Sequence, residues 1–158
     1  MEDELKQLLD ERDIINIVNS IGIYADRHNW DKLSQAFAFE VLLDYSSMGA
    51  PAEKLKPPEI ITRWKALLPG FKMTQHVITN HRVTITGDEA ECFSYVVATH
   101  YLPNPSAKNI WLVMGYYEHH LIRTSAGWKI DRMKLTATLI DGNTQLPQMA
   151  METVKKMV

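Results

Sequence analysis

The feature that most constrains this chain is a change in the spacing of its apolar residues near its middle. Residues 3–28 repeat apolar side chains at steps of three and four, which is typical of one buried helix face. The second half is instead rich in Val, Ile, Thr, Tyr and Phe, with turn residues between the runs. These runs are predicted strands, at residues 72–86, 91–102, 109–124 and 128–140. A long helix followed by a strand meander predicts an α+β fold.

Shorter elements are expected between the first helix and the meander. Asn29 is a suitable N-cap for a second helix over residues 30–38, and residues 39–46 have a strand-like apolar pattern. A loop is expected over residues 48–56. Pro57 or Pro58 can open a third helix that runs through Leu68, because proline is tolerated in the first helical turn. The tail from Thr144 can add another short helix.

Short connections between the four long strands predict mostly antiparallel pairing. The expected architecture is a curved, mixed but mostly antiparallel sheet closed by three N-terminal helices, in the shape of a cone. The chain has 158 residues, which suits a single domain over residues 1–158. The concave face of such a sheet can hold a small ligand.

Charge and composition exclude several kinds of partner. Seventeen basic and 19 acidic residues give a net charge of −2, so a protein that mainly binds nucleic acid is not expected. No apolar run approaches the roughly 18 residues of a membrane span. The charged start, MEDELKQLLDERD, does not resemble a secretory signal. A single cysteine, Cys92, fits a reducing compartment, so we expect a cytoplasmic location.

The known motifs for nucleotides, zinc and nucleophilic serine are absent. The sequence contains no GxGxxG, GxxxxGK[ST], GxSxG or HExxH pattern. Glu118, His119 and His120 are adjacent on a predicted strand, where neighbours point to opposite faces and cannot simply share a metal. We therefore expect neither a cofactor nor a metal site.

Several polar residues fall on predicted inward faces. Asp26 ends the first helix one turn after Gly22, and His76 stands inside an apolar strand. A solvated helix-end aspartate and a core histidine bonded to a carbonyl are the alternative interpretations. Two later strands combine histidines with small residues that leave room for a ligand, with Ser94, Val96, Ala98 and His100 on one and Val113, Gly115, Tyr117 and His119 on the next.

An aspartate and a histidine in a dry cavity have a clear chemical use. A neutral imidazole accepts a proton, while a carboxylate on its other nitrogen fixes the tautomer and stabilises the imidazolium. Tyrosine hydroxyl groups can hold a developing oxyanion. Elimination, enolisation and isomerisation are the reactions that suit this set.

The sequence resembles the SnoaL-like branch of the nuclear-transport-factor-like superfamily. The resemblance rests on YADRHNWDKL at residues 24–33, FAFEV at residues 37–41 and GWKI at residues 127–130. It extends over about residues 9–140. It implies the cone-shaped fold, whose members include dehydratases, isomerases, cyclases and non-catalytic modules.

Within this family the motifs are most similar to those of scytalone dehydratase and hexachlorocyclohexane dehydrochlorinase. The resemblance implies that Asp26 and His76, in TQHVI at residues 74–78, form a dyad with Tyr45 and His100 beside the substrate. It also implies further pocket residues, namely Tyr24, Tyr117, Val96, Ala98, Gly115 and His119. Ala25 replaces the tyrosine that the dehydratase has before the acid, and Tyr117 replaces its polar amide.

The sequence therefore predicts a cofactor-independent lyase that acts on a small, largely apolar ring compound. An isomerase or polyketide-type cyclase with the same pocket is one alternative, and a non-catalytic binding or dimerisation module is another. The opposite strand face carries Phe93, Tyr95, Val97 and Tyr101. So much apolar surface favours a homodimer or homotrimer.

Overall fold

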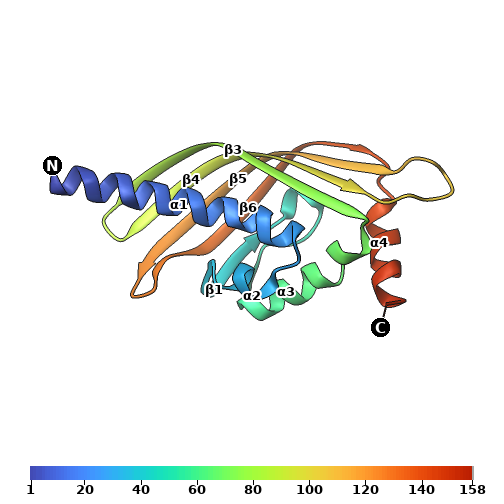
Figure 1. The fold of residues 1–158 in the computed structure, drawn as a ribbon, viewed down its shortest axis with the longest axis horizontal. Coiled ribbons are helices and arrows are strands. Elements are labelled where there is room, and N and C mark those ends of the chain that lie inside the picture. The colour runs from blue at the N-terminus through green and yellow to red at the C-terminus, as the bar shows by residue number, and fades with distance from the viewer. Residues whose placement is uncertain (158) are drawn as a thin grey trace.

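The first helix, α1 (Glu2–Asp26), spans most of the molecule's length (Figure 1). The computed structural model describes residues 1–157, so the last residue of the predicted domain lies outside the described part. The apolar stripe of α1 is buried at Ile14, Val18, Ile21 and Ala25. The predicted buried face spans residues 3–28, but Leu5 and Leu8 are exposed because the first turns extend beyond the sheet.

Six strands form one curved sheet in the order β2-β1-β6-β5-β4-β3. The sheet confirms the predicted α+β class. Among the described strands, β1 and β6 are the only neighbours that pair in parallel, and the other neighbouring pairs are antiparallel. The strands are β1 (Phe37–Asp44), β2 (Glu53–Leu55), β3 (Met73–Thr86), β4 (Glu89–Tyr101), β5 (Ile110–Thr124) and β6 (Gly127–Gly142).

Two predictions for the segment after α1 were wrong. The second helix, α2 (Trp30–Ser34), has the expected Asn29 cap, whose side chain accepts from the Lys32 amide, but it ends four residues early. The chain enters β1 at Phe37, which pairs with Ile130, because sheet pairing overrides the local helical pattern. The expected loop over residues 48–56 contains the short edge strand β2.

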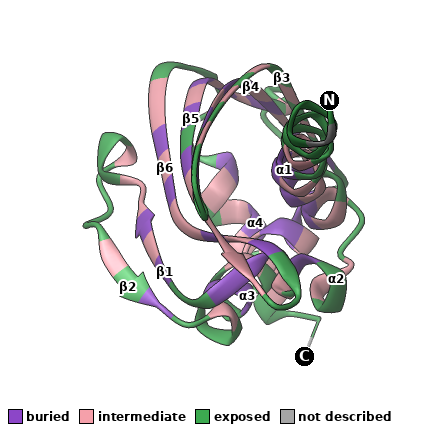
Figure 2. Ribbon diagram, turned by 90° about the vertical axis from the view of Figure 1, so that its left-hand side faces the viewer, coloured by how far each residue is buried: buried purple, intermediate pink, exposed green. Residues whose placement is uncertain are grey.

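Helices close the concave side of the sheet (Figure 2). The third helix, α3 (Pro57–Lys65), buries Ile60 and Ile61 and is followed by the 3₁₀ turn η2 (Leu68–Gly70). The last helix, α4 (Leu146–Lys155), packs on this turn. A Cβ atom at Gly70 would lie 1.9 Å from the Ala150 carbonyl oxygen, so only glycine permits this close packing.

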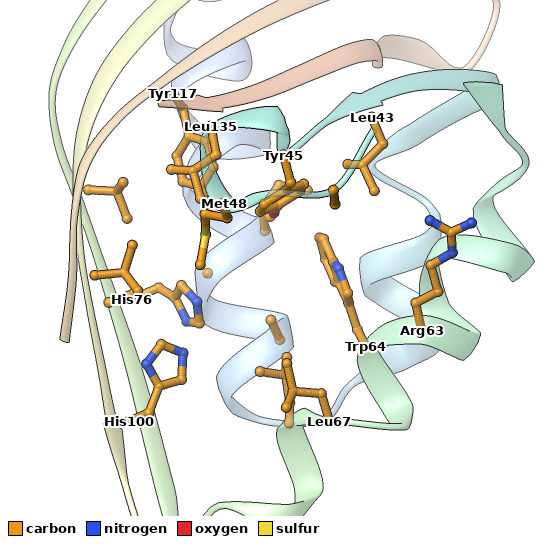
Figure 3. Close-up of a pocket in the computed structure, with 18 of the residues that line it drawn as sticks. Leu43, Tyr45, Met48, Arg63, Trp64, Leu67, His76, His100, Tyr117 and Leu135 are labelled. Carbon is orange, nitrogen blue, oxygen red and sulfur yellow. The ribbon is translucent and has the colours of Figure 1, made fainter. Parts of the chain in front are cut away.

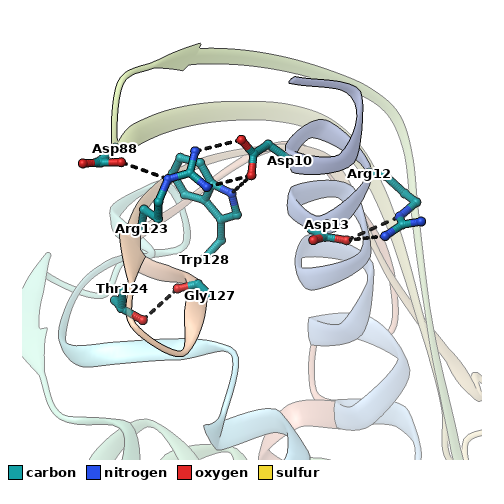
Figure 4. A network of polar contacts seen from close by, with 8 residues as sticks. All are labelled: Asp10, Arg12, Asp13, Asp88, Arg123, Thr124, Gly127 and Trp128. Atoms are coloured by element: carbon teal, nitrogen blue, oxygen red, sulfur yellow. Dashed lines mark hydrogen bonds and ion pairs between the residues drawn. The ribbon is translucent and has the colours of Figure 1, made fainter. Parts of the chain in front are cut away.

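A polar network fastens α1 to the far end of the sheet (Figure 4). Arg123 donates to both carboxylate oxygens of Asp10 at 2.7 and 2.8 Å, and the Trp128 indole donates to the same carboxylate at 3.0 Å. The hydrogen bond from Arg123 is the largest influence that lowers the pKa of Asp10 to about 2. Arg123 also pairs with Asp88 in the β3–β4 turn, which ties three parts of the fold together.

The two faces of the sheet differ sharply in burial. On β4, Ser94, Val96, Ala98 and His100 face inward and are buried. Tyr95, on the opposite face, is 53% exposed. Alternation along the strand therefore separates a lined interior from an apolar exterior. Within residues 1–157, no helix combines the length and apolar character needed to cross a membrane.

Candidate active site

Asp26 and His76 meet where the end of α1 crosses the start of β3. Oδ1 of Asp26 lies 2.7 Å from Nδ1 of His76, and Oδ2 accepts the His76 backbone N–H at 2.8 Å. The Thr74 hydroxyl donates to Oδ1 at 2.8 Å. Both side chains of the pair are mostly buried, with 14% and 16% of their surface exposed. Three donors thus hold one carboxylate in a single orientation.

Gly22 is what allows the helix to come so close to this strand. A Cβ atom at Gly22 would lie 3.0 Å from the His76 Cβ atom and 3.2 Å from the His76 carbonyl oxygen. This spacing is tighter than ordinary van der Waals contact. The missing side chain therefore makes room for the His76 backbone itself.

The protonation of the pair follows from its contacts. Burial by itself would raise the pKa of Asp26, but hydrogen bonds from His76 and Thr74 and the charge of His76 lower it below its usual value. The group is therefore a carboxylate at neutral pH. A carboxylate only accepts hydrogen bonds, so Nδ1 of His76 is the donor in this contact. In the neutral imidazole this tautomer leaves the lone pair on Nε2.

His100 lies beside His76 on the neighbouring strand. The two ring centroids are 5.6 Å apart and the rings are nearly perpendicular. Nδ1 of His100 lies 3.2 Å from the Trp111 carbonyl oxygen, which can only accept, so this nitrogen is the donor. Burial, and then the charge of His76, lower the pKa of His100 to about 4. His100 is therefore neutral, with Nε2 as an acceptor.

Two tyrosines line the other wall (Figure 3). Tyr45 follows the end of β1, and Tyr117 lies on β5. Burial, and then interaction with the Tyr117 hydroxyl, hold the pKa of Tyr45 well above its usual value. Burial likewise raises the pKa of Tyr117 to about 12. Both phenols therefore keep their protons and can donate hydrogen bonds at neutral pH.

These groups surround a cavity of about 310 Å³. Its walls are mainly apolar, and Val96 and Ala98 are among them, as is Trp64 of α3. Arg63 stands at its edge, where its Nη1 donates to Glu53 at 2.6 Å. The volume and lining suit a compact, mostly apolar ligand.

The sequence interpretation also placed Tyr24, Gly115 and His119 in the pocket, but none of them lines the cavity. Gly115 does not leave space for a ligand, because a Cβ atom there would lie 2.0 Å from the Thr136 carbonyl oxygen of β6. His119 is fully buried farther along β5, and Tyr24 packs against the core beside Lys32. The alternation of side chains along β5 predicted the correct face for Gly115 and His119, but it could not show where the cavity ends.

Other lining residues escaped the sequence interpretation. Trp64 and Arg63 come from α3, and Met48, Ala50 and Pro51 come from the segment between β1 and β2. The segment is held by Ser47, whose hydroxyl donates to the Leu135 carbonyl oxygen at 2.8 Å and accepts the Ala137 N–H at 2.9 Å. Both contacts join residues far apart in the chain, so no local sequence pattern predicts them.

The comparisons with known proteins agree with this fold. A family model described as a SnoaL-like domain matches residues 6–134, and the chain belongs to this family. The Kfla4162 protein from Kribbella flavida is 28% identical, with a TM-score of 0.85, covering 90% of this chain and 99% of its own. The comparison with curated proteins gave no match.

Two further solved structures share the fold at lower identity. A scytalone dehydratase-like protein from Novosphingobium aromaticivorans is 19% identical with a TM-score of 0.72, covering 89% of this chain and 91% of that one. The hexachlorocyclohexane dehydrochlorinase LinA-type3 from Novosphingobium barchaimii is 16% identical with a TM-score of 0.74, covering 89% and 94%. Such identities establish a common fold, and this fold hosts lyase-like enzymes.

Proposed function

We propose that this protein is a lyase that removes water from a small, largely apolar ring compound by general base catalysis, without a cofactor. The observation that carries the proposal is the Asp26–His76 pair at the wall of a cavity of about 310 Å³. A non-catalytic module would not need a carboxylate that fixes the tautomer of a cavity histidine. The pairing therefore supports an enzyme over a binding module.

In the proposed reaction, Nε2 of His76 takes a proton from a carbon next to a carbonyl group. The carbon–hydrogen electron pair forms the new double bond, and the carbon–oxygen bond to the leaving hydroxyl breaks. Tyr45 donates a hydrogen bond to the carbonyl oxygen, which gains negative charge as the carbon loses its proton. The imidazolium of His76 then gives this proton to the leaving hydroxyl oxygen, which departs as water and leaves the imidazole neutral. Asp26 stabilises the imidazolium throughout.

The state of His100 favours a hydroxyl over a halide as the leaving group. Its Nδ1 is committed to the Trp111 carbonyl oxygen, so Nε2 offers only a lone pair. A substrate hydroxyl can donate to that lone pair, whereas a bound halide has no proton to donate. A buried acceptor left without a donor costs about 1–3 kcal/mol, which selects for an alcohol.

The test is a mass-spectrometric screen of small cyclic β-hydroxy ketones. We expect at least one to lose the mass of water with the wild-type protein and not with a His76→Gln variant. A product of unchanged mass would instead identify the isomerase or cyclase alternative. Binding without any conversion, across compounds that fit the cavity, would support the non-catalytic module.

We also propose that the convex sheet face pairs with a second copy of the chain. The face carries Phe93, Tyr95, Val97 and Tyr101, and the Tyr95 side chain is 53% exposed. Phe93 packs between Tyr95 and Tyr116, with ring centroids 5.4 Å from each. An aromatic cluster of this kind on an exposed sheet face is typical of a protein interface.

A further inference from the structure

Three polar side chains lie together inside the cone but outside the cavity. Ser94 and His119 are fully buried, and His81 is partly buried. Among the residues that the structure describes, four of their polar atoms have no hydrogen-bond partner: Nε2 of His81, Oγ of Ser94 and both ring nitrogens of His119. Leaving so many buried polar atoms without partners is costly, and native proteins usually satisfy them.

Sheet register brings the three residues side by side. Ser94 pairs with Tyr117, and its strand neighbour on the same face, Cys92, pairs with His119. Ser94 and His119 are therefore diagonal neighbours on the inner face. Tyr117 is next to His119 on that face, with ring centroids 5.1 Å apart. The cluster thus begins directly behind a wall of the cavity.

A β-bulge in β3 brings His81, the third residue of the cluster, to the inner face. Register passes from the Thr79–Tyr95 pair to the Arg82–Phe93 pair, so two residues of β3 lie opposite Ser94 alone. Asn80 takes the left-handed conformation there, with φ of 59°. The extra residue reverses the facing of all that follow, which turns His81 inward beside Ser94.

The chemistry of the cluster limits what can occupy it. Burial, and then the charge of His81, lower the pKa of His119 to about 3, and burial lowers the pKa of His81. Both imidazoles are therefore neutral, each with one donor and one acceptor, so an anion meets no charge there. Among the described residues, no three His, Cys, Asp or Glu side chains are grouped to hold a metal ion. The occupant must be small, neutral and able both to donate and to accept.

We propose that His81, Ser94 and His119 form an internal water site behind Tyr117, separate from the substrate cavity. Water is the smallest molecule with this hydrogen-bonding capacity, and buried waters typically bridge about three otherwise unpaired groups. The water fixes the tautomers of both histidines. It also supports the ring of Tyr117 through His119. This inference does not depend on the proposed reaction.

The first test is the sign of a stability change. If the site holds water, Ser94→Ala removes a hydrogen-bonded hydroxyl and lowers the melting temperature by about 3 °C. In a His119→Leu background, where the bridge is already broken, the same change has little effect. Cys92→Ala, the matched control, alters packing beside His119 without removing a hydroxyl. Its coupling to His119→Leu therefore measures packing alone and should be smaller than that of Ser94→Ala.

A melting temperature that does not fall in Ser94→Ala would overturn the proposal. In a dry cluster, Ser94→Ala removes an unpaired buried hydroxyl, and the melting temperature stays constant or rises. An equal loss in both backgrounds also overturns the proposal, because it removes the coupling between the two residues. Since Ser94→Ala is small, its measurement stands even if His119→Leu fails to fold.

A second measurement identifies the occupant. Oxygen-17 relaxation dispersion detects long-lived internal water, and we expect its amplitude to fall in Ser94→Ala relative to wild type and Cys92→Ala. Native mass spectrometry of the same preparation reports any retained organic molecule. An unchanged dispersion amplitude, or a retained molecule whose hydroxyl group fills the cluster, overturns the assignment to water.

Discussion

Nδ1 of His76 lies 2.7 Å from Oδ1 of Asp26, although 50 residues separate the two in sequence. The contact joins the last residue of α1 to the inner face of β3. It depends on the close packing at Gly22 and on the Thr74 and backbone donors that orient the carboxylate. The chemistry proposed for the cavity follows from this pair.

Replacing Asp26 with Asn should impair turnover much more than stability. An amide can donate to Nδ1 and so favour the wrong tautomer, and it cannot stabilise an imidazolium. We expect kcat to fall by about a thousandfold. Thr74→Val, which removes one donor to Asp26 and leaves the carboxylate, is the matched control and should cost about tenfold or less. Similar kcat values for both variants would contradict the role of Asp26.

Gly22→Ala tests whether close approach of α1 to β3 positions His76. The new Cβ atom would lie 3.0 Å from the His76 Cβ atom, so the helix and strand must shift apart. We expect kcat to fall by about tenfold to a hundredfold. Alanine is favoured over glycine in helices by about 1 kcal/mol, which offsets part of the packing cost.

The control for this variant is Asn16→Ala, at an exposed position of the same helix. It changes helix propensity without meeting β3. Unimpaired kcat in Gly22→Ala, with Asn16→Ala also unimpaired, would show that the contact does not position the base.

The buried histidines make stability fall in mild acid. The pKa of His100 is lowered to about 4 and that of His119 to about 3, mainly by burial, from 6.5 in the unfolded chain. Below pH 6.5 the two histidines therefore bind protons in the unfolded state but not in the folded state. Stability is full above pH 6.5 and is lost as the pH falls toward 4. Urea unfolding at pH 7 and pH 5 should differ by about 2 kcal/mol for each histidine.

His100→Asn should flatten this pH dependence by about one proton. The measurement is the slope of unfolding free energy against pH between 5 and 6.5. An unchanged slope in the variant would mean that His100 titrates normally in the folded protein.

Tyr95→Glu tests the proposed interface between copies. A charge within the aromatic cluster, at its most exposed ring, should convert the oligomer to a monomer in sedimentation velocity. Leu8→Glu is the matched control, since Leu8 is 63% exposed on the projecting turns of α1. We expect it to leave the sedimentation coefficient unchanged. Dissociation by Leu8→Glu and not by Tyr95→Glu would place the interface on α1 instead.

Much of the fold could be predicted because its signals are local. The apolar stripe of α1, the Asn29 cap and the alternation along β4 each depend on residues a few positions apart. The end of α2 could not be predicted in this way. Its boundary is set by the pairing of Phe37 with Ile130, more than ninety residues later in the chain.

The candidate site could likewise be predicted only where its signals are local or belong to a family motif. Family motifs related Asp26 to His76, and parity placed His100 and Tyr117 on inner faces. The extent of the cavity depends on packing between distant segments, such as Thr136 against Gly115 and Ser47 against β6. The β3 bulge that turns His81 inward was not predicted either, although Asn80 is a residue type that tolerates the left-handed conformation found there.

The most direct measurement is the rate of water loss catalysed by His76→Gln, compared with wild type, on a compound identified by the screen. Circular dichroism and the melting temperature establish that the variant is folded. If Nε2 of His76 is the base, the rate falls by at least about a hundredfold. A folded variant that retains a rate within about tenfold of wild type would contradict the assignment.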